Sequence, residues 1–205
     1  MIRKKLFLYE VALLHIITWW GIRIFSPRFL FTGVALGTPE RWLIRLLRAV
    51  AVVLIIFIWI KLRKFSFKNI GIGGKNFWKY FFIGFFFVVI LRIMIKGYFP
   101  GGSKSYTLKL LAIITAFMDV LAQQISTFGL IQKMMERKLG IKISFLSAWL
   151  SFGLAHFFIS PSLTGVFIAF SAGLLFGLTL WKTKNLGAGL GMHSGFHFML
   201  AIYYA

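Results

Sequence analysis

Long apolar runs separated by short polar or basic segments make up the length of the chain. Most of these runs approach the roughly 20 residues that an α-helix needs to cross the hydrocarbon core of a bilayer. Because lipid offers no hydrogen bonds, backbone groups in such runs must pair within the segment, as they do in a helix. The pattern therefore predicts an all-α fold, a polytopic transmembrane helix bundle of about seven spans. These spans are residues 6–25, 43–62, 77–95, 108–134, 144–158, 163–181 and 186–204.

Helix-breaking residues fall between the predicted spans. Pro27, Pro39 and two glycines lie in the connection after the first span, and Pro100 with its neighbouring glycines follows the third. No repeat and no low-complexity tract interrupts the series, so we interpret residues 1–205 as a single integral membrane domain. The first span is interpreted as retained, because its apolar run is longer than that of a signal peptide.

Composition agrees with a membrane protein, since hydrophobic residues make up 60% of the chain and the mean hydropathy is +0.87. The 24 lysines and arginines, against 4 acidic residues, give a net charge of +20. These basic residues flank the apolar runs, which favours contact with the lipid bilayer and its anionic headgroups over nucleic-acid binding. Arg45 and Arg48, in the first turns of the second span, are expected to snorkel towards headgroups. The absence of cysteine excludes disulfides and thiolate chemistry.

The basic residues are also unevenly divided between the two sides of the predicted bundle. Residues 61–79 carry six of them, on the same side as Arg3, Lys4 and Lys5. The positive-inside rule makes this side cytoplasmic, which predicts a cytoplasmic N-terminus and an outside C-terminus. We interpret the chain as an integral membrane protein of the plasma membrane of a prokaryote.

Polar side chains interrupt the fourth span between Asp119 and Gly129. On a helix, Asp119 and Gln123 lie one above the other, with Gln124 and Thr127 about 100° to one side. An ionisable or amide group in hydrocarbon costs roughly 2.5–3.5 kcal/mol on insertion scales, so such residues usually face a bundle interior. The stripe predicts a polar site inside the bundle, with histidines from other spans as partners.

Three histidines in the later spans are the candidate partners. His156 is a lone histidine in the fifth span, whereas His193 and His197 are four residues apart and share one helix face. Such a pair can chelate a metal, and His156 would complete a three-histidine zinc site. The other interpretation treats all three as packing or hydrogen-bonding groups. We expect a metal-free site, because no carboxylate lies in either histidine motif and Gly195 loosens the helix between the paired histidines.

Three motifs in the second half of the chain follow one another in a recognisable order. They are Gln123-Gln124-Ile-Ser-Thr-Phe128, Phe152-Gly-Leu-Ala-His156 and His193-Ser-Gly-Phe-His197. Their order and spacing resemble the CPBP family, which comprises the CAAX prenyl proteases and the bacteriocin-processing enzymes also called Abi proteins. The family pattern is Glu-Glu-x-x-x-Arg, then Phe-x-x-x-His, then His-x-x-x-Asn or Asp. The resemblance implies a CPBP/Abi-like core at residues 107–205, with its catalytic positions at Gln123, Gln124, His156, His193 and His197.

The resemblance also implies intramembrane peptide hydrolysis, in which the glutamates and a histidine activate a water and later motifs stabilise the oxyanion. This sequence departs from that pattern. Gln123 and Gln124 replace both glutamates, Phe128 replaces the arginine and His197 replaces the final Asn or Asp. A glutamine amide accepts no proton at neutral pH, and general-base help is typically worth about 10²–10⁴-fold. Because several positions differ together, natural divergence is a simpler account than an engineered inactivation.

These departures leave two main functions open. The first is a catalytically impaired pseudoprotease that acts as a membrane scaffold or as a peptide-binding or immunity protein, with a peptide or another membrane protein as its partner. The alternative is an active intramembrane CAAX-type endopeptidase that uses Asp119 or the histidines in place of the glutamates. Asp119 is the candidate relocated base, because it lies one turn before Gln123 on the same helix face. The other interpretation of Asp119 is a helix-packing hydrogen bond or a pair with a nearby Arg or Lys. A transporter-like or assembly subunit with the same fold is a third interpretation.

Overall fold

The computed structural model describes residues 2–25, 38–96, 106–159 and 162–204. Helices account for nearly all of these residues and no strand occurs among them, so the all-α prediction is confirmed. The elements in chain order are α1 (Ile2–His15), the π-helix η1 (Ile16–Phe25), α3 (Pro39–Leu62), the short 3₁₀ helix η2 (Phe67–Ile70), α4 (Phe77–Lys96), α5 (Tyr106–Gln123), the π-helix η3 (Gln124–Met134), α6 (Glu136–Leu139), α7 (Ile141–Ile159), α8 (Leu163–Thr183) and α9 (Gly187–Tyr204).

Five helical segments are long and apolar enough to cross a membrane, which confirms the predicted polytopic bundle. They are Pro39–Leu62, Phe77–Ile95, Tyr106–Leu139, Ile141–Phe158 and Leu163–Thr183. Two further segments, α1 with η1 and α9, fall where the first and last spans were predicted. Glycines and histidines make up a third of α9. Residues of that kind lower its hydropathy, so its place in the bundle depends on packing against other helices.

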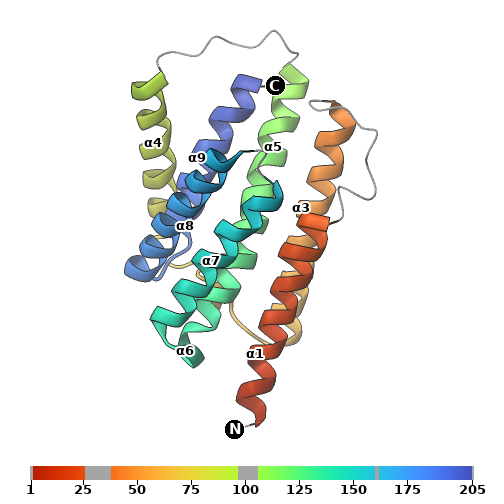
Figure 1. Cartoon of the computed structure of the whole chain (residues 1–205), viewed down its shortest axis with the longest axis vertical. Helices are drawn as coiled ribbons and strands as arrows, with labels where there is room; N and C mark the ends of the chain where they lie inside the picture. The colour runs from red at the N-terminus through yellow and green to blue at the C-terminus, as the bar shows by residue number, and fades with distance from the viewer. Residues whose placement is uncertain (1, 26–37, 97–105, 160–161, 205) are drawn as a thin grey trace.

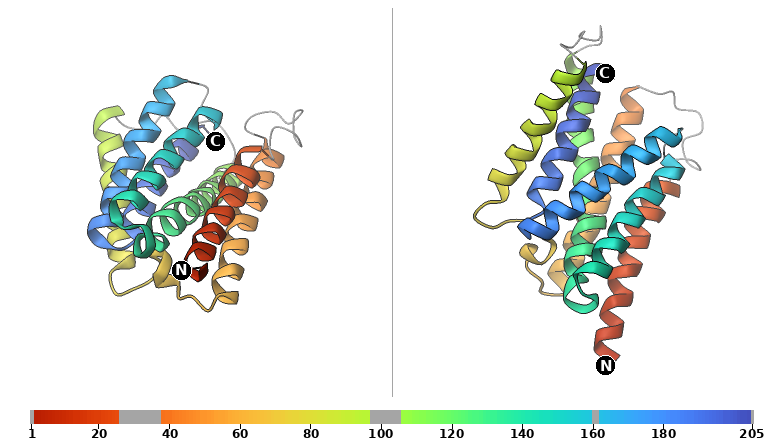
Figure 2. Two further views of the ribbon diagram at one scale, coloured as in Figure 1. Left: turned by 60° about the horizontal axis from the view of Figure 1, so that its bottom comes forward. Right: turned by 60° about the vertical axis from the view of Figure 1, so that its left-hand side comes forward.

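The continuous helix made of α5 and η3 forms the axis of the bundle (Figures 1 and 2). Along it, α5 packs against α3 and α9, and η3 packs against α1, α7 and α8. The outermost helix, α4, packs mainly on α9. The first helix begins at one end of the bundle and α9 ends at the other (Figure 1). The polar residues of η3 are therefore enclosed by helices from both halves of the chain.

Local signals set where two of these helices begin. The side chain of Thr38 accepts a hydrogen bond from the backbone N–H of Arg41, and Pro39 occupies the first helical position of α3. Ser162 accepts in the same way from the N–H of Gly165 at the start of α8. Such caps pair backbone donors that a helix start otherwise leaves unpaired.

Glycines allow α9 to approach α4 at backbone distance. A Cβ atom placed on Gly191 would lie only 2.0 Å from the carbonyl oxygen of Phe81, and Gly187 and Gly195 make similarly close approaches to α4. Small residues at such spacing are typical of tightly packed membrane helices. This contact holds α9 in a fixed register, and α9 carries both histidines of the third motif.

A loop contact fixes the start of α9 as well. The carbonyl of Gly71, just after η2, accepts a hydrogen bond of 2.9 Å from the N–H of Leu186. Gly71 has φ of +79°, a conformation that L side chains rarely adopt. The same loop packs Ile70 onto η3 at Gly129, where a Cβ would lie 3.2 Å from the Ile70 carbonyl oxygen. The loop therefore links η3 to the beginning of α9.

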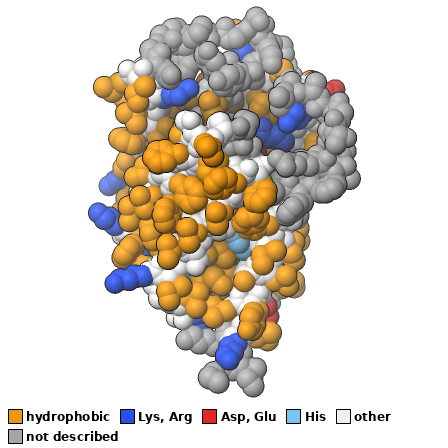
Figure 3. All heavy atoms as spheres, viewed as in Figure 1, with side chains coloured by type: hydrophobic (Ala, Val, Ile, Leu, Met, Phe, Trp, Pro, Cys, Tyr) orange, Lys and Arg blue, Asp and Glu red, His pale blue; other side chains and the backbone are white. Residues whose placement is uncertain are grey.

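The outer surface of the bundle is apolar over much of its height. Hydrophobic side chains dominate the face shown in Figure 3, and basic side chains lie mostly towards its edges. Exposed apolar residues are especially frequent on α4, including Trp78, Phe82 and Phe86. A surface of this kind suits hydrocarbon and not water, so the chain is an integral membrane protein in a lipid bilayer.

Candidate functional site

The polar stripe predicted for the fourth span lies inside the bundle. Asp119, Gln123, Gln124, Ser126 and Thr127 are each at most 4% exposed. Regular α-helix ends at Gln123 and the wider π-helix begins at Gln124, so the change of helix type falls between the two glutamines. Short π-helical insertions occur often at functional sites, where they change the direction in which neighbouring side chains point.

Gln124 and His193 form the central contact of the site. The amide Nε2 of Gln124 lies 3.2 Å from Nδ1 of His193, and both side chains are buried. An amide nitrogen can only donate, so Nδ1 of His193 must accept. The close approach depends on Gly189, because a Cβ there would lie 3.2 Å from the amide oxygen of Gln124. The first and third motifs therefore meet through one hydrogen bond.

Gln123 is placed differently from Gln124. It is 4% exposed, and its side chain makes no hydrogen bond to a residue that the structure describes, whereas Gln124 bonds through its amide nitrogen although neither amide oxygen has a partner there. The backbone carbonyl of Gln123 accepts a bond of 3.3 Å from the hydroxyl of Ser126. The structure thus brings Gln124, but not the side chain of Gln123, into hydrogen-bond contact with a motif histidine.

Aromatic rings fill the space around the Gln124–His193 contact. Phe128, Phe152 and Phe176 lie with ring centroids 5.5–5.9 Å apart and are each at most 5% exposed. The His193 ring stacks on Phe176 at 5.0 Å. We call Phe128, Phe152 and Phe176 the aromatic cluster. Phe128, which occupies the arginine position of the family motif, is thus a packing residue of the core.

His156 contacts the Phe152 ring, which also contacts His193. The Phe152 ring is 4.7 Å from the His156 ring and 5.7 Å from the His193 ring. Nδ1 of His156 donates to the backbone carbonyl of Phe152 at 2.7 Å, and the side chain is half-buried. The second motif therefore contributes both a histidine and a ring that contacts His193 of the third motif.

His193 and His197 lie side by side, with ring centroids 4.9 Å apart. His197 is half-buried, whereas His193 is only 5% exposed. Across residues 2–25, 38–96, 106–159 and 162–204, no group of three or more His, Cys, Asp or Glu side chains is arranged to hold a metal ion. The arrangement of His156, His193 and His197 does not fit the three-histidine zinc site considered as an alternative.

Asp119, the candidate relocated base, forms an ion pair with α3. Its carboxylate lies 2.7 Å from the guanidinium of Arg45 and 3.7 Å from that of Arg48. The Arg45 guanidinium also lies 4.9 Å from the Trp42 ring centroid. The expectation that both arginines extend towards headgroups was wrong, because their guanidinium groups contact a carboxylate inside the bundle.

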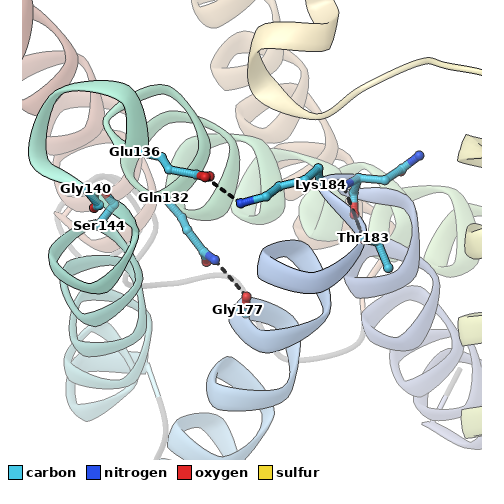
Figure 4. A network of polar contacts seen from close by, with 8 residues as sticks. Gln132, Glu136, Gly140, Ser144, Gly177, Thr183 and Lys184 are labelled. Atoms are coloured by element: carbon cyan, nitrogen blue, oxygen red, sulfur yellow. Dashed lines mark hydrogen bonds and ion pairs between the residues drawn. The ribbon is translucent and has the colours of Figure 1, made fainter.

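A third buried glutamine, Gln132, lies eight residues after Gln124 on η3. Nε2 of Gln132 donates to the carbonyl of Gly177 at 2.7 Å, which joins η3 to α8 (Figure 4). Nearby, Glu136 forms an ion pair with Lys184 (Figure 4). Sequence reasoning did not single out Gln132. The signal was available, since it is a polar residue in an apolar run, but its partner is a backbone carbonyl that no motif marks.

Comparison with known proteins agrees with the predicted resemblance. Residues 105–199 match the family described as type II CAAX prenyl endopeptidase Rce1-like, and the resemblance is confirmed over this part of the chain. The matched segment covers just under half of the chain and includes all three motifs. Searches of curated proteins and of solved structures found no match to the chain.

Proposed function

We propose that this Rce1-like chain is a catalytically impaired pseudoprotease that binds a peptide or a membrane protein inside the bilayer, as a scaffold or an immunity protein. The contact between Gln124 and His193 within the aromatic cluster is the observation that carries the proposal. The proposal also takes the chain to reside in a prokaryotic plasma membrane with its N-terminus in the cytoplasm, where anionic headgroups meet its basic loops.

The chemistry of the Gln124–His193 contact supports the loss of hydrolysis. A general base needs a lone pair free to accept a proton from water. The Gln124 amide offers no basic lone pair at neutral pH, and it occupies the Nδ1 lone pair of His193 as a donor. In a neutral ring the proton of His193 then lies on Nε2, so this histidine is a donor towards its other side.

Phe128 supports the same conclusion from the electrostatics of the site. The family arginine would supply a positive charge beside a carboxylate or an oxyanion, and an apolar ring supplies none. Phe128 is 1% exposed and packs on Phe152 and Phe176. Removing a glutamate and removing the arginine are mutually compensating changes, because each would otherwise leave the other as an unpaired buried charge.

The ion pair of Asp119 argues against the relocated-base enzyme. The Asp119 carboxylate lies 2.7 Å from the Arg45 guanidinium and is engaged in an ion pair. Its partners come from α3, whereas the histidine motifs lie on α7 and α9. We therefore assign Asp119 to helix packing and not to proton transfer.

Binding without turnover tests the proposal. Protein reconstituted in lipid vesicles is titrated with a fluorescent farnesylated peptide to measure binding. The bound peptide is then recovered, and its mass is determined by mass spectrometry. We expect saturable binding with the peptide intact. His197→Ala should weaken binding, because this half-buried imidazole can donate to a bound carbonyl, whereas the exposed Lys142→Ala serves as the matched control. Absence of saturable binding would overturn the peptide-binding role.

A further inference from the structure

A polar contact centred on His15, a residue outside the three motifs, joins α1, η3 and α7. Nδ1 of His15 lies 2.7 Å from the backbone carbonyl oxygen of Ser126, and its Nε2 lies 2.7 Å from the hydroxyl oxygen of Ser151. His15 is 5% exposed and Ser151 is half-buried. Both ring nitrogens of His15 are thus held by partners from two other helices.

The two partners fix which nitrogen carries the proton. A backbone carbonyl can only accept, so Nδ1 must donate to Ser126. In the neutral ring Nε2 then has a free lone pair, and the Ser151 hydroxyl donates its proton into it. The hydroxyl hydrogen of Ser151 consequently points at a base.

Other hydroxyls of the membrane helices behave differently. Ser144 donates to the carbonyl of Gly140 and Thr183 to that of Thr179, each four residues earlier in the chain. This local bond is the common way in which a mid-helix serine or threonine is paired. The Ser151 hydroxyl instead reaches an imidazole that is 136 residues away in sequence.

We propose that Ser151 is an activated nucleophile for acyl transfer, with His15 as its general base and the Ser126 carbonyl as the group that orients the imidazole. A nucleophile within hydrogen-bond reach of a base that a third group orients is the arrangement by which serine hydroxyls are activated. The neighbours Leu150 and Leu154 are 38% and 44% exposed on the apolar surface. The substrate class is accordingly a carboxylic ester that reaches Ser151 from the bilayer, such as a lipid acyl ester.

The reaction balances with water as the only co-reactant. The Ser151 oxygen forms a bond to the acyl carbon as its proton moves to Nε2 of His15, and the ester C–O bond then breaks. His15 returns that proton to the departing alkoxide, which leaves as an alcohol. In the second half, water attacks the acyl carbon, its proton passes through Nε2 to the Ser151 oxygen, and the carboxylic acid is released.

This inference is independent of the pseudoprotease proposal, because it uses none of the family motif histidines or glutamines. A fluorophosphonate probe, which forms a covalent bond with activated serines, tests it on the full chain in detergent and in lipid vesicles. We expect labelling of Ser151 in the unmodified protein, identified by peptide mass spectrometry, and loss of labelling in Ser151→Ala. Ser147→Ala, an exposed serine one turn earlier on α7, is the matched control and should label normally.

The role of His15 is tested by the rate of labelling. His15→Gln keeps a donor for Ser126 but provides no base, so the rate should fall by roughly a hundredfold. If that variant does not fold, the pH profile of the unmodified protein replaces it, and the rate should rise to a plateau through one ionisation. Three results would each contradict the proposal: a folded protein in which Ser151 is not labelled, a labelling rate that is unchanged in His15→Gln, or a flat pH profile. The contact between His15 and Ser151 would then serve helix packing only.

Discussion

Asp119 and Gln124 lie five residues apart on the same continuous helix, and both are buried, yet their surroundings differ in charge. Asp119 forms ion pairs with two arginines from the first half of α3. Gln124 is neutral and pairs with a histidine in the middle of α9, among aromatic rings. A carboxylate thus occurs where two arginines of α3 reach it, and the position five residues later carries an amide.

The difference shows what has changed at the motif positions. A carboxylate at Gln124 would need a cation, and the ring of Phe128 occupies the place where the family pattern supplies one. The Asp119 pair shows that this bundle can hold a buried carboxylate when arginines accompany it. The neutral pair at Gln124 therefore suits the aromatic cluster around it. Substitutions at Asp119 and at Gln124 test the charged pair and the neutral pair separately.

The largest effect is expected at the charged end. Asp119→Ala leaves Arg45 and Arg48 beside each other without a carboxylate, and we expect a loss of about 3 kcal/mol, near the lower end for a broken buried pair because Arg45 is partly exposed. Thermal and denaturant unfolding in detergent measures this loss. Glu40→Ala, an exposed acid at the start of α3, is the control and should change stability little. If Asp119→Ala is as stable as the unmodified protein, the ion pair does not stabilise the bundle, and the contrast between Asp119 and Gln124 is wrong.

A smaller effect is expected at the neutral end. Gln124→Met keeps most of the side-chain volume but leaves Nδ1 of His193 buried without its donor, which should cost about 1–3 kcal/mol. The matched variant is Gln123→Met. Unlike Gln124, the Gln123 side chain makes no hydrogen bond to a described residue, so that change should be close to neutral. Equal losses from the two variants would contradict the assignment of Gln124 as the paired amide.

The smallest effect is expected beyond the site, at Gln132. Gln132→Met removes one hydrogen bond to the carbonyl of Gly177, and a neutral bond of this kind contributes about 1 kcal/mol. The same unfolding measurement applies. A loss as large as that of Asp119→Ala would mean that charge does not distinguish the two ends of the helix.

The helices were largely predictable from sequence, because in a bilayer the length of an apolar run nearly determines the length of a helix. The bounds of α3 and α8 lie within a few residues of the predicted spans. The order of the motifs also predicted the family resemblance found over residues 105–199. What the pattern did not predict is the π-helix that begins at Gln124, since hydrophobic periodicity does not distinguish a π-helix from an α-helix over so few residues.

The pairing of polar groups was less predictable. Arg45 and Asp119 are 74 residues apart, and only the packing of α3 on α5 brings them together. Histidines were expected as partners of the polar stripe, which holds for Gln124 with His193. For His15, the partners Ser126 and Ser151 follow from the contacts of α1 with η3 and α7, and no local spacing encodes them.

Peptide cleavage is the measurement that tests the loss of catalysis most directly. The unmodified chain and the double variant Gln123→Glu with Gln124→Glu are reconstituted in vesicles and incubated with a farnesylated CAAX peptide, and the released tripeptide is quantified by mass spectrometry. We predict no cleavage by the unmodified protein and little recovery in the double variant, because Phe128 still occupies the arginine position and residues that act as a unit do not contribute additively. Robust cleavage by the unmodified protein that is abolished by His156→Ala would contradict the account and establish an active protease.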